Sequence, residues 1–286
     1  MKEKLRLIYQ QNKGLTFILP SLMGVSLFFL FPYLNVLIQS FMSPMENEGV
    51  SLRNYQQVID NQAFRLAASN TIKFVGVCLP ILLSLSLVFA LMLRRSSRVT
   101  HWLKTGFLFP MVIPVASIAF FWRLVFEKQG LLNLLVSTIG LTPMDWMNTK
   151  EAFWLLVFTY VWKNLGYNLI LWLAGLSGIS ESIYEAAQVD GANQWMIFWR
   201  ITVPNLLPTF FITTVLSTLN TFKIFREAYL VAGEYPHQSM YLIQHVFNNW
   251  FREMDISKMA AGSVLNTGVI MGLILLLQRK WGAMDE

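Results

Sequence analysis

Six long apolar stretches constrain the fold of this 286-residue chain more than any other feature. A helix that crosses the hydrocarbon core of a bilayer needs about 20 mainly apolar residues, and each stretch is near that length. They cover residues 15–38, 71–93, 105–126, 153–176, 206–228 and 261–277. Because helices satisfy all their backbone hydrogen bonds internally, the pattern predicts an all-α integral membrane protein with six transmembrane helices.

The composition also fits a bilayer better than water. Hydrophobic residues make up 55% of the chain and charged residues only 13%, which is too little charge for a soluble domain of this length. The net charge of +6 is spread between the apolar stretches without a dense basic patch. It therefore indicates a membrane surface and not a nucleic-acid partner. The single cysteine, Cys78, cannot form a disulfide within the chain.

Several of the apolar stretches contain proline, namely Pro20, Pro32, Pro80, Pro110 and Pro114. Membrane helices tolerate proline where neighbouring helices satisfy the freed carbonyl groups. The first stretch is too long for the apolar core of a signal peptide, and no small-residue cleavage site follows it. We therefore expect it to be a retained transmembrane helix.

Basic clusters indicate which side of the membrane each loop occupies. They comprise Lys2, Lys4, Arg6 and Lys13 before the first stretch, Arg94, Arg95, Arg98 and Lys104 after the second, and Arg279 and Lys280 after the last. The opposite loops carry more scattered basic residues mixed with acidic ones. The positive-inside rule then predicts that both termini are cytoplasmic. The expected organisation is a cytoplasmic segment 1–14, a transmembrane domain 15–278 and a cytoplasmic tail 279–286.

One polar segment, residues 180–208, lies between the fourth and fifth stretches on the predicted cytoplasmic side. Ser180 or Ser182 can cap a first helix, and Asp190-Gly191 is a turn signal that ends it. A second short helix from Asn193 carries the apolar residues Trp195, Met196, Phe198 and Trp199. The residues alone leave two interpretations open: an amphipathic linker on the lipid headgroups, or a docking site for another protein.

The letters EAAQVDGANQWMIFWRITVPNLLP, residues 185–208, resemble the EAA loop of bacterial ATP-binding-cassette (ABC) importer permeases. The positions that carry the resemblance are Glu185, Ala186, Ala187, Asp190, Gly191, Ala192, Phe198, Ile201, Pro204 and Pro208. The letters NYQQVIDNQAFRLAASNTIKF, WKNLGYNLILWLAGLSGI and FLFPMVIPVASIAFFWRLVF, the last with GLLN, resemble the carbohydrate-uptake branch of that family. The first stretch resembles the maltose- and glycerol-phosphate-type permeases.

The resemblance implies a sugar importer subunit in a bacterial inner membrane. It implies three kinds of partner besides the bilayer: a second homologous permease, two ABC ATPase subunits and an extracytoplasmic solute-binding protein. In the family the EAA loop forms the coupling helix that docks on an ATPase. Met196 and Phe198 are then candidate anchors, Glu185 a candidate polar contact, and Gly191 the residue that permits the turn.

Local motifs for covalent chemistry are absent from the sequence. There is no GxxxxGK[ST] loop to hold nucleotide phosphates, and no HExxH, GxSxG or CxxC motif. His101, His237 and His245 lack metal-like spacing, so we expect solvated or interface histidines and no metal or cofactor on this chain. ATP and Mg²⁺ are expected on the partner ATPases.

Three other functions remain open besides a sugar importer. The chain could be a permease for glycerol phosphate, an amino acid or a polyamine. It could also be a phosphotransfer permease or membrane enzyme, or a channel.

Polar residues inside the apolar stretches are candidates for the solute pathway, because polar groups are costly in a bilayer. Tyr160, Asn164 and Tyr167 share one helical face of the fourth stretch with Asn168. The fifth stretch adds Ser217, Asn220 and Thr221, and Lys163 is charged near the middle of the fourth. Aromatic rings can stack on the C–H faces of a sugar, and amides can form hydrogen bonds with its hydroxyl groups. The alternative is that these groups bond neighbouring helices, at about 0.6–2 kcal/mol each.

The segment AGEYPHQSMYLIQHVFNNWFREMDISK follows the fifth stretch on the predicted outer side. By resemblance, this region meets the solute-binding protein. Its Gly-Glu-Tyr-Pro letters depart from the glycine-rich turn that the family often has there.

Overall fold

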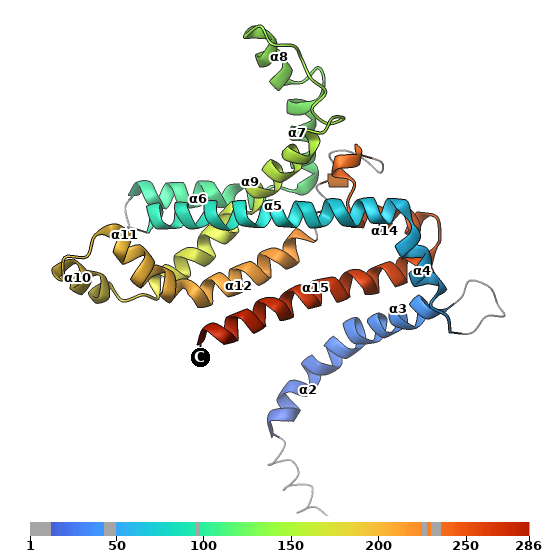
Figure 1. Cartoon of the computed structure of the whole chain (residues 1–286), viewed down its shortest axis with the longest axis horizontal. Helices are drawn as coiled ribbons and strands as arrows, with labels where there is room; N and C mark the ends of the chain where they lie inside the picture. Colours follow the sequence, from blue (N-terminus) through green and yellow to red (C-terminus); the bar gives the residue numbers. More distant parts are fainter. Residues whose placement is uncertain are drawn as a thin grey trace, which may run out of the picture. The chain divides into compact units, whose positions relative to one another are not determined.

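The computed structural model describes residues 13–42, 50–94, 98–222, 224, 228–229 and 236–285. These residues form helices, with an isolated antiparallel bridge between Met42 and Val50 (Figure 1). The prediction of an all-α protein is therefore confirmed. Lys2, Lys4, Arg6 and Arg95, which served to predict the orientation, lie outside the described residues.

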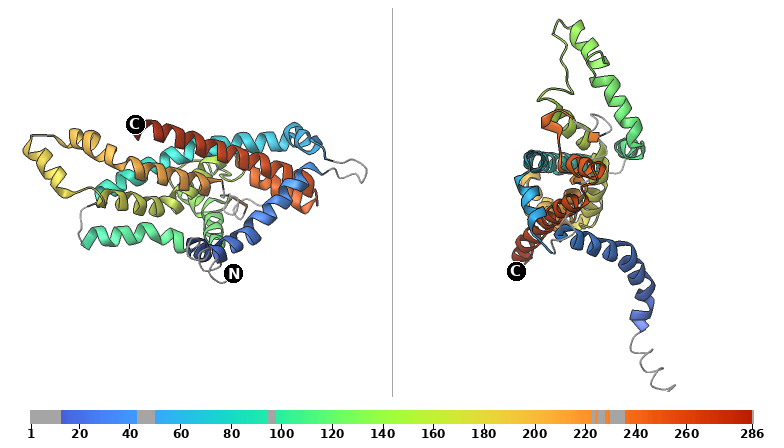
Figure 2. Two further views of the ribbon diagram at one scale, coloured as in Figure 1. Left: turned by 90° about the horizontal axis from the view of Figure 1, so that it is seen from below. Right: turned by 90° about the vertical axis from the view of Figure 1, so that its right-hand side faces the viewer.

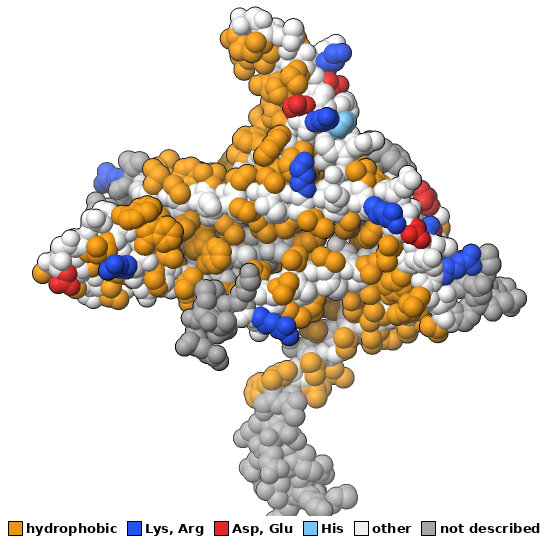
Figure 3. All heavy atoms as spheres, in the orientation of Figure 1, with side chains coloured by type: hydrophobic (Ala, Val, Ile, Leu, Met, Phe, Trp, Pro, Cys, Tyr) orange, Lys and Arg blue, Asp and Glu red, His pale blue; other side chains and the backbone are white. Residues whose placement is uncertain are grey.

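Four helical segments in the described ranges are long and apolar enough to cross a membrane: residues 17–41, 62–93, 194–221 and 256–279. A fifth candidate is the pair 100–112 and 115–138, which meets the criterion only when its two parts are taken together. Helix α9 (Ala152–Ser177) is long enough to cross a membrane but is not among these candidates. Polar residues such as Lys163 and Asn164 lower its mean hydropathy. Exposed hydrophobic side chains cover much of the visible surface of the helices (Figure 3).

The third predicted stretch is not one straight helix. It divides into α6 (Arg98–Val112) and α7 (Val115–Phe126), which are bent by 96° relative to each other. Pro114 lies at the N-cap of α7, where its fixed φ and missing N–H end the preceding helix. The stretch predicted as a span over 105–126 is therefore broken before Pro114, and together with α8 it is a candidate for one broken span.

One compact unit comprises residues 1–61 and 250–269. Here α2 (Lys13–Val25), a π-turn (Ser26–Leu30) and α3 (Phe31–Phe41) form a continuous helix, so it begins and ends beyond the predicted 15–38. Helix α4 (Arg53–Asp60) is fastened to the end of α3, because the buried Asn54 amide donates to the carbonyls of Ser40 at 3.0 Å and Met42 at 2.8 Å.

The second unit comprises residues 62–249 and 270–286. Its membrane-sized part is built from α5 (Gln62–Leu93), α6, α9 and α12 (Val203–Thr221), and α9 contacts the other three (Figures 1 and 2). α8 (Leu131–Thr138), α10 (Glu181–Val189), α11 (Gln194–Ile197) and a 3₁₀ turn (Gln238–Met240) connect them. α14 (Ile243–Arg252) and α15 (Ile256–Asp285) each have residues in both units.

Two glycines on α9 let its backbone approach its neighbours. A Cβ atom at Gly166 would lie 2.0 Å from the Phe107 carbonyl oxygen of α6, and one at Gly175 would lie 2.3 Å from Thr209 Oγ1 of α12. Small residues at helix crossings are the usual way in which membrane helices pack closely. The position of α9 among its neighbours therefore depends on these two glycines.

We predict that Gly166→Val destabilises the protein by about 1–3 kcal/mol, because the added side chain must force α6 and α9 apart. Gly76→Val is the matched control, since a Cβ there meets nothing within 4 Å. Thermal unfolding of the purified protein in detergent measures the effect. Equal unfolding midpoints for the two variants would refute the close approach of α6 and α9.

Candidate functional site

Residues 180–208 fold as the predicted helix, turn and second helix, α10 followed by α11. Ser180 occupies the N-cap position of α10, but its hydroxyl bonds that of Ser182 at 2.8 Å and caps no backbone N–H. The prediction that one of these serines caps the helix was therefore wrong. Glu181 and Glu185 lie in the first half of α10, where acidic side chains favour the helix dipole.

The turn after α10 is a Schellman motif. Gly191 has φ +77°, a conformation that glycine adopts without steric penalty. Its N–H donates to the Gln188 carbonyl at 3.0 Å, and the Ala192 N–H donates to the Ala187 carbonyl at 2.9 Å. The prediction that Asp190-Gly191 ends the helix is confirmed, and the bonds fix the direction in which the chain leaves α10.

The second helix is fixed at both of its ends. The Asn193 side chain accepts a hydrogen bond from the Met196 N–H at 2.8 Å and caps α11. A π-turn over Phe198–Thr202 then leads into α12, with the Val203 N–H bonded to the Phe198 carbonyl. Pro204 follows directly, and a wider turn before a proline relieves its clash with the carbonyl four residues earlier. The segment therefore continues into α12 without a break.

Buried side chains attach both short helices to the ends of the long ones. Tyr184 of α10 and Ile197 of α11 are buried in one cluster with Leu93 of α5, Leu176 of α9 and Leu206 of α12. Ala187 and Ala192, on either side of the turn, pack against the same cluster. The segment is thus part of the same packed body as three long helices.

The outward face of the segment carries four large apolar side chains beside polar ones such as Gln188 and Gln194. Val189, Trp195, Met196 and Trp199 are exposed, with Val189 at 88% and Trp195 at 71%. The Trp195 and Trp199 rings meet edge to face at 5.6 Å. Of the two predicted anchors, Met196 lies on this face, whereas Phe198 is half-buried and lines a cavity behind it. Ala186 and Asp190 are exposed, and Pro204 begins α12.

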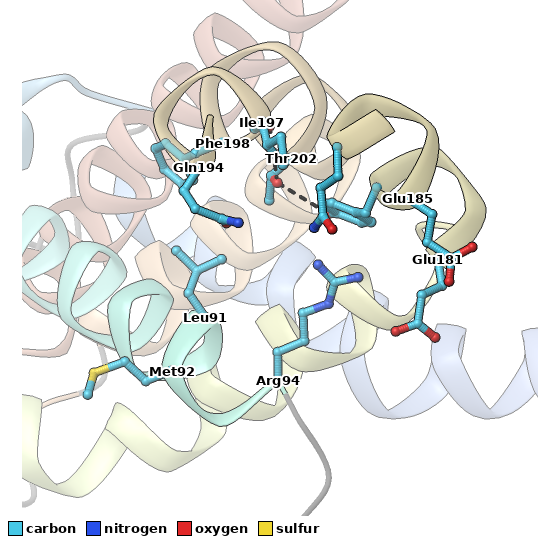
Figure 4. A pocket seen from close by; sticks show the side chains of 11 residues that line it. Leu91, Met92, Arg94, Glu181, Glu185, Gln194, Ile197, Phe198 and Thr202 are labelled. Carbon is cyan, nitrogen blue, oxygen red and sulfur yellow. Dashed lines mark hydrogen bonds between the residues drawn. The ribbon is translucent and has the colours of Figure 1, made fainter. Parts of the chain in front are cut away.

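The cavity behind the segment has a volume of about 620 Å³ and is lined by residues of α5, α10, α11 and the π-turn (Figure 4). Arg94 points into it from the end of α5 (Figure 4). Its guanidinium carbon lies 4.0 Å from the centre of the Tyr184 ring, and the Tyr184 hydroxyl lies 3.2 Å from Thr202 Oγ1. In the sequence, Arg94 indicated only the orientation, and no local pattern links it with Tyr184 or Thr202.

The predicted pathway residues fall into two groups. Tyr160, Ser217 and Thr221 are buried between α9 and α12: the Tyr160 and Thr221 hydroxyls are 3.1 Å apart, and Ser217 donates to Asn168 Oδ1 at 2.6 Å. Lys163, Asn164, Tyr167 and Asn220 are half-buried. The Asn164 amide donates to the Tyr160 carbonyl at 2.9 Å, within α9. The first group therefore joins two helices of this chain, and the second retains exposed surface.

The segment before α14 is fastened to α5 by polar contacts. The Asn70 amide donates to the carbonyls of Gln238 at 2.6 Å and Tyr241 at 2.9 Å. Thr71 Oγ1 accepts from the Ile243 N–H at 3.1 Å, and His245 Nδ1 accepts from the Leu242 N–H at 3.1 Å. The start of α14 is therefore capped by its own histidine and by α5.

His245 is 1% exposed, so the expectation of a solvated or interface histidine was wrong at this position. Burial lowers the pKa of His245 to about 4 from its ordinary value near 6.5. His101 is exposed, and His237 is half-buried with Nδ1 2.9 Å from Ser239 Oγ. Within the described residues, no three His, Cys, Asp or Glu side chains are grouped as metal ligands would be.

Comparison with known proteins identifies the family. Residues 82–278 match the model of the family described as "binding-protein-dependent transport system inner membrane component". The chain is similar to the lactose transport system permease protein LacF of Rhizobium radiobacter, with 30% identity over 97% of this chain and 96% of the relative. It is also similar to the trehalose/maltose transport system permease protein MalF of Thermococcus litoralis, with 29% identity over 95% and 94%.

A solved structure has the same fold. A chain in the crystal structure of a bacterial ABC transporter involved in the import of the acidic polysaccharide alginate superimposes with a TM-score of 0.86. The match covers 99% of this chain and 100% of that one at 20% sequence identity. At this identity the likeness shows the fold alone.

We predict that acid weakens the cap of α14. Since the folded-state pKa of His245 is depressed, its contribution to stability is complete above about pH 6.5 and falls by roughly 3 kcal/mol as the pH approaches 4. His245→Gln is the matched variant, because glutamine can accept from the Leu242 N–H without titrating. Thermal unfolding at pH 7 and pH 5 should show a smaller difference for His245→Gln than for the wild type. An equal difference would exclude His245 as its cause.

Proposed function

The chain belongs to the family of binding-protein-dependent transport system inner membrane components, and on this premise we propose that it is the sugar-translocating permease subunit of an ABC importer. Family membership makes it a multi-pass inner membrane protein whose role is transport and not covalent chemistry. As the family description says, such transport depends on a binding protein.

The substrate that we propose is a sugar or oligosaccharide, delivered by an extracytoplasmic solute-binding protein. Two similar permeases that match almost the whole chain are those for lactose and for trehalose or maltose. The half-buried residues Asn164, Tyr167 and Asn220 offer the rings and amides that suit a sugar. Tyr160, Ser217 and Thr221 would support this surface from behind, through their contacts between α9 and α12.

The proposed architecture has six transmembrane helices, with α9 as the span that adds to the five membrane-sized candidates. Both termini, Arg94 and residues 180–208 would lie in the cytoplasm, in keeping with the basic clusters. A second homologous permease would complete the translocation pathway, and two ABC ATPase subunits would bind ATP and Mg²⁺. The outer half of the pathway would then meet the solute-binding protein.

The observation that carries this proposal is the construction of residues 180–208, in which an exposed apolar face is fixed to the ends of three spans. Val189, Trp195 and Met196 form a surface on which an ATPase subunit can dock. Behind them, Tyr184 and Ile197 are buried against α5, α9 and α12. Closure of the ATPases would move the segment as one body and tilt these helices, which is rigid-body alternating access.

An importer for an anionic solute, such as glycerol phosphate, is the second candidate. Lys163 is half-buried in α9, and a cation there would attract a phosphate or carboxylate. Competition for uptake of a labelled disaccharide separates the two classes. Inhibition by neutral sugars supports the sugar importer, whereas inhibition by glycerol phosphate alone supports the second candidate.

We predict that Gly191→Pro still inserts into the membrane but loses sugar uptake and solute-stimulated ATP hydrolysis by about tenfold or more. Proline cannot adopt φ +77° and has no N–H for the Gln188 carbonyl, so the turn between α10 and α11 cannot form. Uptake and ATPase activity of the complex in proteoliposomes measure the effect.

Gly140→Pro is the matched control, because Gly140 has φ +80° and also donates to a carbonyl, that of Ser137. It lies after α8, away from residues 180–208. Normal uptake by Gly191→Pro, or an equal loss in both variants, would contradict the docking role of the segment.

A further inference from the structure

We infer that Arg94 is a positioning residue that transmits force between α10 and α5; this inference rests on the proposed function. Arg94 terminates α5 at the edge of the cavity behind residues 180–208, with its guanidinium stacked over the Tyr184 ring at 4.0 Å. Tyr184 in turn meets Thr202 through its hydroxyl at 3.2 Å. Three side chains therefore connect α5, α10 and the π-turn that leads into α12.

The contact suits arginine in particular. A guanidinium is planar and stacks on an aromatic face, whereas the compact, strongly hydrated ammonium of lysine does so less well. Tyr184 is 8% exposed and Thr202 is 3% exposed, so both partners of this connection are held in place by packing. Glu181 and Glu185 line the same cavity to one side of Arg94 (Figure 4).

The cavity explains why this one contact matters. Tyr184 and Ile197 pack on one side against an apolar cluster that includes Leu93, Leu176 and Leu206. On the opposite side the cavity separates the end of α5 from α10 and α11, and the Arg94–Tyr184 stack spans it. Without Arg94, α10 keeps its apolar seat but loses its support across the cavity. Part of the movement that ATPase closure imposes on residues 180–208 then deforms this segment and is not passed on to α5.

The test measures sugar transported per ATP hydrolysed by the complete complex in proteoliposomes. Arg94→Ala and Arg94→Lys should assemble and hydrolyse ATP, with the transport-to-hydrolysis ratio reduced about five- to thirtyfold. Tyr184→Phe keeps the ring but loses the Thr202 contact, and should give a smaller reduction. Arg98→Ala, on the neighbouring helix α6, is the control and should keep the wild-type ratio.

An unchanged ratio in Arg94→Ala, or loss of assembly in both Arg94 variants, would overturn the inference, because the residue would then be dispensable or merely structural. Failure of the proposed function looks different. In that case the wild-type complex itself moves no sugar, and the solute-binding protein does not stimulate its ATP hydrolysis.

A different observation concerns α8, and we propose that the outward face of this helix lies against the acyl chains of the bilayer. This helix buries a polar side chain and exposes apolar ones. Asn133 is 3% exposed and donates to the carbonyls of Lys128 at 2.9 Å and Met144 at 2.6 Å. Its Oδ1 accepts from the Met144 N–H at 3.1 Å and the Trp146 Nε1–H at 2.9 Å.

The outward side of the same helix is apolar. Leu131, Leu134 and Leu135 are 56–65% exposed, and Ile139 in the loop is 72% exposed. Residues 129–144 contain no Asp, Glu, Lys or Arg, although a solvated loop of this length normally carries charge. An exposed apolar patch on this scale indicates a partner surface.

The geometry selects lipid as that partner. The 96° bend after α6 turns α7 and α8 away from the direction of α6 (Figures 1 and 2), and the segment 100–138 that contains them is apolar enough to count as a membrane segment. The exposed face continues onto α7 through Phe120 and Leu124, in the same apolar segment. The outward residues of α8 are aliphatic, whereas the hot spots of protein interfaces are enriched in Trp, Tyr and Arg.

Spin labels test this placement in the reconstituted complex. On a Cys78→Ala background, labels at Leu134→Cys and Leu135→Cys should be accessible to oxygen and inaccessible to a water-soluble nickel chelate. A label at the exposed Lys150→Cys should show the reverse. Access of the nickel chelate to positions 134 and 135 would overturn the proposal in favour of solvent. Exclusion of both reagents would overturn it in favour of a protein partner.

Discussion

Every polar group that a helix carries into a bilayer must find a partner there, and this requirement organises the molecule. α9 carries several polar side chains, and residues of the neighbouring helices form hydrogen bonds with some of them. The Trp172 indole donates to Ser86 of α5 at 3.0 Å, and Asn168 and Tyr160 meet Ser217 and Thr221 of α12. α9 is consequently the centre of its unit, and its residues Trp172, Asn168 and Tyr160 fix α5 and α12 beside it.

The segment at residues 180–208 shows how local backbone chemistry fixes the shape of a connection between two long helices. Its turn depends on Gly191, its second helix on the Asn193 cap, and its junction with α12 on the wide turn before Pro204. None of these features buries much surface. Together they present Trp195 and Met196 outward while Tyr184 and Ile197 remain packed inward, which is the arrangement that a docking element needs.

Local patterns were readable from the sequence, and contacts between distant residues were not. Apolar length predicted the helices, and Asp190-Gly191 predicted the turn, because each depends on a few consecutive residues. Pro114 marked a break in the third stretch, but a proline by itself does not encode the 96° angle between α6 and α7. The Arg94–Tyr184 stack and the bonds between α9 and α12 join residues far apart in the chain, and no periodicity encodes them.

The close approach at Gly166 has a consequence for motion. Since a Cβ there would sit 2.0 Å from the Phe107 carbonyl, the α6 and α9 backbones touch with no side chain between them. A rotamer change cannot loosen such a crossing, so we expect α6 and α9 to keep their relative position in any motion of this unit. Bending would then fall on the ends of the pair, such as the break before Pro114.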